Sequence, residues 1–476
     1  MTLLIYSGLA LLFATIIGAF GLAPTCSLGY RPMVSGYTIT LVTMLIYIAF
    51  SAAIPIVFND MQFVNALAYS SEEEIFGTLC VSWAAVVLFV LSYLYFTRDR
   101  PINMRPASLY RPSQANFHIL AYVMLAIGLV MKALFVQRSG GLQTLLLSRS
   151  GGLAQSLGLT DEVDRGSIYL NEMSFIADAA ACWLLLTALR VRKSTFVHIL
   201  IFAVTIGFSF LLTPKRLVLL APILAILIGF GIYVWPLRLR YAPYFVAAAM
   251  GFSLITLLTR IFLPAYLAGV NVLDFANFDR VRYFVVHLMG MDMGFFEGTA
   301  VAVYGTNDVI AKFGSWGGAF YFPNVEPFFY IVPRFIWPLK PDHFVDVAVA
   351  VGTVMYGGTL EKANWGYGVG LVGTSWLYGG FAGLVVGMGI LGWASAVCDR
   401  FMAKMHYASP ERILIFAVAC TTLFHLYRQG TIGWVFLNFV QTQAPFFVAV
   451  LVLLYVSSRG DKRSAIASPS VLEVGG

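Results

Sequence analysis

Long apolar runs recur along almost the whole chain, and each is long enough to cross a lipid bilayer as a helix. A spanning helix needs about 20 mostly apolar residues, and a chain segment in lipid must satisfy its own backbone hydrogen bonds. Hydrophobic residues make up 59% of the 476 residues and charged residues only 11%, whereas a soluble domain carries about 25% charged residues. We therefore predict an all-α polytopic membrane protein with about 11 transmembrane helices. These fall near residues 1–22, 36–58, 75–97, 117–136, 171–189, 196–213, 217–235, 243–265, 371–397, 411–428 and 431–456.

Lys and Arg residues are unevenly divided between the two sets of short connections. One set carries sixteen of them and the other carries six. Because cytoplasmic loops are enriched in Lys and Arg, the pattern predicts an N-terminus outside, a C-terminus inside and a large outer loop between the eighth and ninth spans. The first thirty residues contain no Lys or Arg, so we expect the first apolar run to be retained as a helix rather than cleaved as a signal peptide.

Four segments follow from this topology. Residues 1–265 form the first eight spans, with a second outer loop over 137–170. Residues 266–370 form the large outer loop, in which we expect short interfacial helices, because a loop so rich in aromatic residues is not typical of disorder. Residues 371–456 form the last three spans, and the polar tail 457–476 is expected to be disordered.

The net charge of +7 is explained by the basic loops that orient membrane helices, so no nucleic-acid partner is expected. The five cysteines are scattered and contain no CxxC pair. This spacing predicts neither a disulfide framework nor a metal site, and we expect no cofactor. The sequence also lacks a phosphate-binding P-loop, an HExxH zinc motif and a GxSxG nucleophile elbow.

Basic residues gather on the predicted outer face, where the orientation rule does not explain them. Lys215 and Arg216 form a turn between two spans, and Arg428 occupies an equivalent position before the last span. Arginine holds phosphate oxygens with two parallel hydrogen bonds. We therefore predict a diphosphate-binding cluster at the level of the lipid headgroups. Its members are Arg216, Lys215, Arg280, Arg282, Arg334, Lys340 and Arg428.

The large outer loop also carries aromatic side chains and possible general bases. Tyr330 and Trp337 lie in a proline-rich stretch and are suited to stacking on sugar rings. Proton acceptors in the loop are His343, Glu297 and Asp292, with Asp342 and Asp346 as further possibilities. Their spacing does not single out one of them.

Two patterns within the spans favour packing over chemistry. Lys132 and Asp178 lie at membrane depth on neighbouring helices, where they could neutralise each other as a buried pair. Gly379, Gly383 and Gly387 recur at four-residue spacing, which allows another helix to approach closely.

The layout resembles the bacterial oligosaccharide repeat-unit polymerases, the Wzy or O-antigen polymerase family. The resemblance rests on the Thr-x-Lys-Arg turn at Thr213 to Arg216, on the late outer loop and on two short stretches. These stretches are Val332-Pro333-Arg334-Phe335-Ile336-Trp337-Pro338-Leu339-Lys340-Pro341 and Ser375-Trp376-Leu377-Tyr378-Gly379-Gly380-Phe381-Ala382-Gly383. O-antigen ligases are similar in outline.

This resemblance implies a metal-independent membrane glycosyltransferase, GT-C-like in fold, at the periplasmic face of a bacterial inner membrane. It would polymerise oligosaccharide repeat units carried on undecaprenyl diphosphate into surface polysaccharide, with a chain-length regulator as a possible partner. The cations would bind the diphosphate, and His343, followed by Glu297 or Asp292, would take the acceptor proton. Two alternatives remain open: a ligase that moves the finished glycan, and a transporter or flippase for the lipid-linked glycan.

Overall fold

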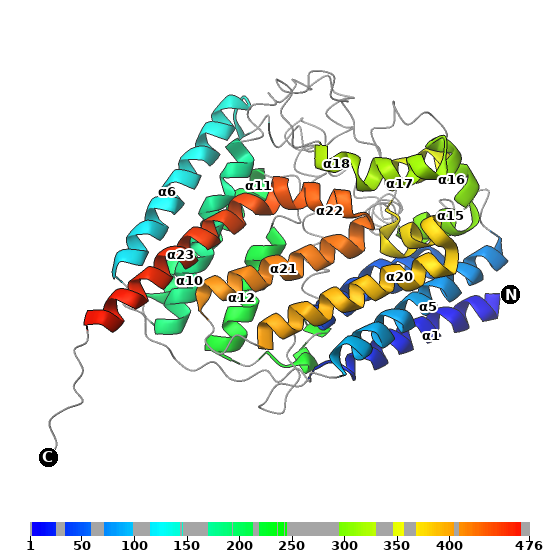
Figure 1. Ribbon diagram of the computed structural model, residues 1–476, viewed down its shortest axis with the longest axis horizontal. Helices are drawn as coiled ribbons and strands as arrows, with labels where there is room; N and C mark the ends of the chain where they lie inside the picture. Colours follow the sequence, from blue (N-terminus) through cyan, green and yellow to red (C-terminus); the bar gives the residue numbers. More distant parts are fainter. Residues whose placement is uncertain are drawn as a thin grey trace, which may run out of the picture.

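The computed structural model describes residues 2–24, 34–58, 71–98, 115–142, 145, 170–192, 194–212, 219–235, 237–241, 243–244, 295–329, 346–356, 368–403 and 409–467. These residues form helices joined by short turns, and no β-sheet occurs among them (Figure 1). The helices of the first half are α1 (Thr2–Phe20), α2 (Gly36–Met44), η1 (Leu45–Phe50), α3 (Ser51–Phe58), α5 (Glu72–Thr97), α6 (Ala115–Arg138), α10 (Phe175–Val191), α11 (Thr195–Leu212), α12 (Leu220–Tyr233) and η3 (Leu239–Tyr241). Those of the second half are α15 (Phe295–Tyr304), α16 (Thr306–Lys312), α17 (Trp316–Asn324), α18 (Glu326–Phe329), α19 (Val347–Tyr356), α20 (Gly370–Ala403), α21 (Pro410–Gln429), α22 (Ile432–Asn438), η5 (Phe439–Gln443) and α23 (Ala444–Ala467).

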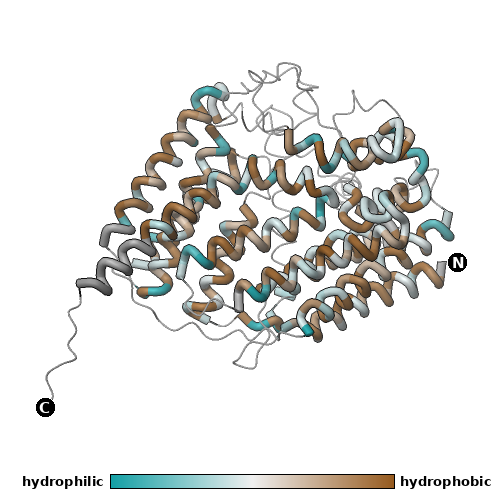
Figure 2. Tube along the Cα trace, viewed as in Figure 1, coloured by the Kyte–Doolittle hydropathy of each residue, from teal (hydrophilic) through white to brown (hydrophobic). Residues whose placement is uncertain are grey.

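Two helices, α10 and α21, lie at the centre of one half of the bundle. Fourteen of the 17 residues of α10 are buried, because α6, α11, α12, α21 and α23 all pack against it. The peripheral helices instead present large apolar side chains on their outer faces, as at Leu11, Ile127 and Val204. Figure 2 shows hydrophobic residues along the lengths of the helices and hydrophilic ones mainly near their ends. This pattern is that of a protein whose outer surface faces lipid.

Within the described ranges, eight helices are long and apolar enough to cross a membrane, which makes the chain a polytopic α-helical membrane protein. Ten of the eleven predicted spans coincide with described helices, and the range 243–265 lies outside the described residues except for 243–244. Two of the ten do not meet the same criteria of length and apolarity. Helix α12 is only 14 residues long, and α21 carries Glu411, Arg412, His425 and Arg428.

The acidic run before the third predicted span begins the helix rather than the loop. The Ser71 hydroxyl accepts a hydrogen bond from the Glu74 N–H at 3.2 Å, and the Ser71 N–H donates to the Glu74 carboxylate at 2.9 Å. This reciprocal capping box satisfies two N–H groups that the first turn would otherwise leave free. Helix α5 therefore starts at Glu72, three residues earlier than the apolar run.

Helix α20 is two helices joined by a sharp reversal. Gly379 and Gly380 have non-helical backbone angles, and Gly380 has a φ of 55°. A methyl group at Gly383 would collide with the Ser375 carbonyl, and one at Gly387 would collide with the Ser375 side chain. In a straight helix, residues 375 and 383 would lie about 12 Å apart. The segment 370–378 therefore folds back along 381–403, and we call it the half-helix.

Gly379, Gly383 and Gly387 were predicted to allow the close approach of another helix, but the structure shows a different partner. The close approach at Gly383 and Gly387 is made by the half-helix of the same element, and Gly379 lies in the turn with no atom near its Cβ position. The span that follows the turn is residues 381–403.

Helices α15 to α18 gather at one end of the bundle, near the start of α5 (Figure 1). Tyr304 of α15 lies against Gly77 of α5, and Gly433 of α22 lies against Pro323 and Pro327 of α17 and α18. We call this end the capped end. The predicted large outer loop thus contains helices, and α15 and α19 pack on each other and on the half-helix side of the bundle. At the other end of the chain, the tail predicted to be disordered from residue 457 is helical as far as Ala467.

Candidate functional site

Three of the predicted site residues lie among the described residues: Glu297, Arg428 and the further possible base Asp346. Glu297 is buried in the first turn of α15, with 7% of its surface exposed. Arg428 lies in the last turn of α21 and is half-buried. The others lie outside the described residues: His343, Asp292, Lys215, Arg216, Arg280, Arg282, Arg334, Lys340, Tyr330 and Trp337.

Arg428 lies at a tight junction between the end of α21 and the start of the half-helix. Helix α21 ends at Gly430, whose φ of 72° allows the chain to turn. A side chain at Gly430 would collide with the carbonyl of Gly370 and the hydroxyl of Thr374. The end of α21 is therefore held against the half-helix. The Arg428 Nε is buried and has no hydrogen-bond partner among the described residues, so this guanidinium retains an unused donor.

Asp346 and Glu297 are the two predicted bases that lie among the described residues. Asp346 precedes α19 and has 8% of its surface exposed. Its carboxylate accepts a hydrogen bond of 2.7 Å from the Val349 N–H, and the Trp434 indole also lies beside it. Burial raises the pKa of Asp346 to about 6, and these hydrogen bonds offset part of that rise. Capping α19 accounts for its position, and the raised pKa also suits a general base that works near neutral pH.

Glu326 is a second carboxylate at the capped end with a raised pKa. It starts α18 and has 9% of its surface exposed. Burial raises its pKa above the ordinary value for a glutamate. Helix α18 packs on α22, the helix that carries Trp434, so Glu326 and Asp346 belong to the same region.

Two helices begin deep in the bundle, near one small pocket. The half-helix starts at Gly370 with a φ of 61°. The first turn of α15 is nearby, and its Phe296 N–H donates 2.9 Å to the Ser51 hydroxyl of α3 rather than to a carbonyl of its own helix. The pocket between them is lined by Tyr47, Ile48, Ser82, Phe295, Phe296, Thr299, Val369, Gly370, Val372 and Tyr427. Helix η1 contributes the first two of these, and such π-helical turns occur frequently at functional sites.

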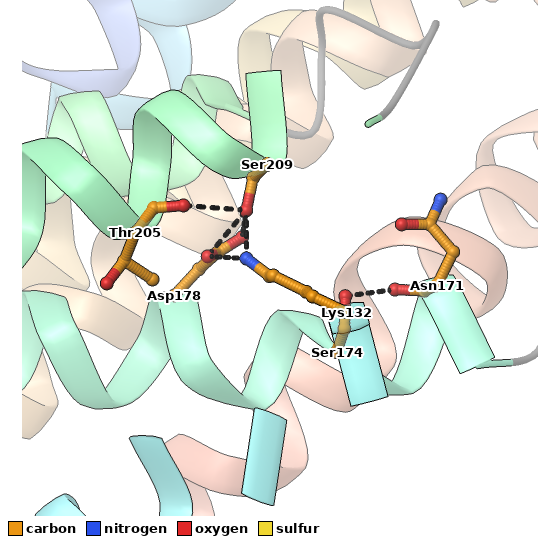
Figure 3. Close-up of polar contacts among 6 residues, drawn as sticks. All are labelled: Lys132, Asn171, Ser174, Asp178, Thr205 and Ser209. Carbon is orange, nitrogen blue, oxygen red and sulfur yellow. Dashed lines mark hydrogen bonds and ion pairs between the residues drawn. The ribbon is translucent and has the colours of Figure 1, made fainter. Parts of the chain in front are cut away.

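Lys132 and Asp178 form the buried pair that their positions predicted (Figure 3). The Lys132 Nζ lies 2.6 Å from the Asp178 carboxylate, and the two side chains are 0% and 1% exposed. The Ser209 hydroxyl contacts Lys132 and donates to both Asp178 oxygens at 2.7 and 2.8 Å. Helices α6, α10 and α11 are thereby joined. Gly128 allows α6 to contact Ala177 of α10 closely, one turn from the pair.

Two buried carboxylates were not singled out from the sequence, and both lie away from the capped end. Asp399 accepts hydrogen bonds from the N–H groups of Gly36 and Tyr37 and from the Tyr93 hydroxyl at 2.8 Å. Glu411 accepts a hydrogen bond of 2.7 Å from the Trp183 indole. Each joins helices that are distant in the sequence, and the apolar pattern around them gives no signal of that pairing.

Among the described residues, no three His, Cys, Asp or Glu side chains are grouped so that they could hold a metal ion. Comparisons with protein-family models, with curated proteins and with solved structures found no match to this chain.

Proposed function

We propose that this protein transfers a glycan from a polyprenyl diphosphate carrier to an acceptor sugar and so polymerises lipid-linked repeat units. The observation that carries the proposal is the junction between α21 and α22: Arg428 lies in the last turn of α21, and Asp346 lies beside Trp434 of α22. An unused arginine donor and a carboxylate with a raised pKa are the two groups that such a transfer needs. The bacterial inner membrane and its periplasmic face are part of this proposal.

The proposed reaction separates charge at the membrane surface. The bond between the sugar C1 and the diphosphate oxygen breaks, and the hydroxyl oxygen of the acceptor sugar bonds to C1. The lipid diphosphate leaves with the additional negative charge, which preorganised cations such as Arg428 stabilise. The predicted cations outside the described residues would complete this cradle, and no metal ion is required in the proposal.

A base must take the proton of the acceptor hydroxyl. Asp346 suits this role best among the described carboxylates, because a pKa of about 6 leaves it ionised at neutral pH and still basic enough to accept a proton. His343, the first choice from the sequence, lies three residues before it and remains a proposal, as do Glu297 and Asp292.

A second candidate function is transport of an anionic lipid-linked glycan. It is favoured by the half-helix that begins deep in the bundle, because discontinuous helices whose N-termini lie near the middle of the membrane are a recurring feature of transporters. A transporter moves its substrate without joining repeat units. A ligase, the other alternative, needs a different acceptor.

The deciding experiment supplies purified protein in lipid vesicles with lipid-linked repeat units alone. We expect a ladder of products of increasing length, and a chelator should leave it unchanged. Arg428→Ala should abolish the ladder, whereas Lys312→Ala, which changes an exposed lysine on α16, should not.

In wild type the rate of polymerisation should fall as pH drops through about 6, because Asp346 becomes protonated. Asp346→Asn should remove most of the activity. Repeat units crossing the vesicle membrane with no ladder would favour the transporter.

A further inference from the structure

The pocket at the start of the half-helix lies deep within the bundle. Ser82, on its α5 side, is ten residues along from Glu72, the first residue of that helix. Ten helical residues rise about 15 Å, which is half of the roughly 30 Å hydrocarbon thickness of a bilayer. The pocket therefore lies beside the apolar length of α5, among the spanning helices, and an unsatisfied polar group here is costly.

Several hydrogen-bond donors at this pocket are nevertheless unused. The N–H groups of Gly370, Leu371 and Val372 form no hydrogen bond with the residues that the structure describes. They are the first N–H groups of the half-helix, where the aligned peptide dipoles leave about half a positive charge. Gly370 and Val372 both line the pocket.

Ser82 provides an independent sign of a ligand. Only 2% of its surface is exposed, it lines the pocket, and its hydroxyl has no partner among the described residues. Its neighbour one turn back, Thr78, is also buried but donates 2.8 Å to the Glu74 carbonyl, as serine and threonine normally do inside membrane helices. The Ser82 hydroxyl makes no such hydrogen bond to a carbonyl one turn back, so its donor is available to a ligand.

We propose that this pocket binds one small inorganic anion of the size and charge of chloride, held by the N-terminus of the half-helix and the Ser82 hydroxyl. The donors are backbone and hydroxyl groups without a compensating acceptor, and the helix dipole favours negative charge. The pocket has room for about one water-sized ligand. A phosphate group or a sugar does not fit this space, so the proposal does not depend on the glycan chemistry, although Tyr427 in the pocket lining is next to Arg428 in the sequence.

The test is direct binding of radiolabelled chloride to the purified, full-length protein by equilibrium dialysis, with gluconate as the balancing anion. We expect one chloride per chain and a thermal unfolding temperature that is a few degrees higher in chloride than in gluconate at equal ionic strength. Ser82→Ala should weaken chloride binding about tenfold and remove most of the shift. Thr78→Val is the matched control, because it removes a satisfied hydroxyl from the same helix, and it should bind chloride like wild type.

Two results would overturn the proposal. Absence of saturable chloride binding would show that the donors serve water alone. Stabilisation of the wild-type protein by polyprenyl phosphate and not by chloride would assign the site to a lipid headgroup. Since wild type alone decides both outcomes, a poorly folded variant does not leave the question open.

Discussion

Lys132 and Asp178 show what it costs to keep two charges inside this bundle. Burying a charge in a medium of low polarity is expensive, and the pair repays the cost only while both partners and their hydrogen bonds remain. Lys132→Met leaves Asp178 and Ser209 without their cation. We expect this change to lower stability by about 3–5 kcal/mol, measured as a fall in the thermal unfolding midpoint in detergent.

Two further variants separate the effect of losing the buried charge from the effect of changing the side-chain shape. The double variant Lys132→Met with Asp178→Leu removes both charges and should recover much of the stability lost by the single change. Lys312→Met alters an exposed lysine on α16 and should change stability by less than about 0.5 kcal/mol. If Lys132→Met were as mild as Lys312→Met, the pair would not be a structural tie.

The Lys132–Asp178 pair could be predicted from the sequence because each charge interrupts an apolar run at a similar depth. Asp399 could not, since it lies at the end of a span beside Arg400, where a charge is ordinary. Its role as the acceptor for the first N–H groups of α2 depends on a contact across 363 residues. Asp346 could be named as one of several bases, but its burial and its position beside Trp434 depend on the fold and are not visible in the sequence.

Helix α20 is the element whose observed shape differs most from the shape that its sequence predicts. Its hydropathy is continuous across Gly379 and Gly380, so it predicts one straight span. The reversal depends on a glycine at a φ of 55° with a ψ of −136°, a combination that side chains other than glycine avoid. It also depends on small residues where the two arms meet. Neither requirement is visible in a hydropathy pattern.

Gly383→Ala tests this reversal. The new methyl group would meet the Ser375 carbonyl, and we expect a loss of about 1–3 kcal/mol from overpacking, read as a lower unfolding midpoint. Gly389, on the same helix, has no atom near its Cβ position. Gly389→Ala should leave stability unchanged or raise it by at most about 1 kcal/mol. Equal effects at the two positions would contradict the folded-back arrangement.

For the molecule as a whole, the charge pattern makes a prediction about orientation. The excess of basic residues on one set of short connections predicts that the capped end faces away from the cytoplasm. In a variant lacking the five native cysteines, Lys312→Cys should react with a membrane-impermeant maleimide in intact cells. Arg192→Cys, exposed at the end of α10, should react only after the cells are opened. The reverse labelling would invert the topology and remove the basis for a periplasmic site.

Much of the whole-molecule plan could be predicted from the sequence, because apolar length alone marks a membrane helix. Helices α12 and α21 show where that rule weakens. Since α21 is surrounded by other helices rather than lipid, it tolerates His425 and Arg428, and its composition no longer resembles that of a span. The cap helices α15 to α19 are too short and too mixed in composition for their positions to be predicted.

The carboxylate of Asp399 has a consequence for biogenesis. Asp399 accepts hydrogen bonds from the N–H groups of Gly36 and Tyr37, which lie 363 and 362 residues before it in the chain. These two residues therefore leave the ribosome long before Asp399 does. During synthesis these N–H groups therefore lack their carboxylate partner, or bind water, until α20 has been made and Asp399 packs between the start of α2 and Tyr93. The early helices of this chain enter the membrane as a provisional arrangement, and translation of a distant acidic residue completes it.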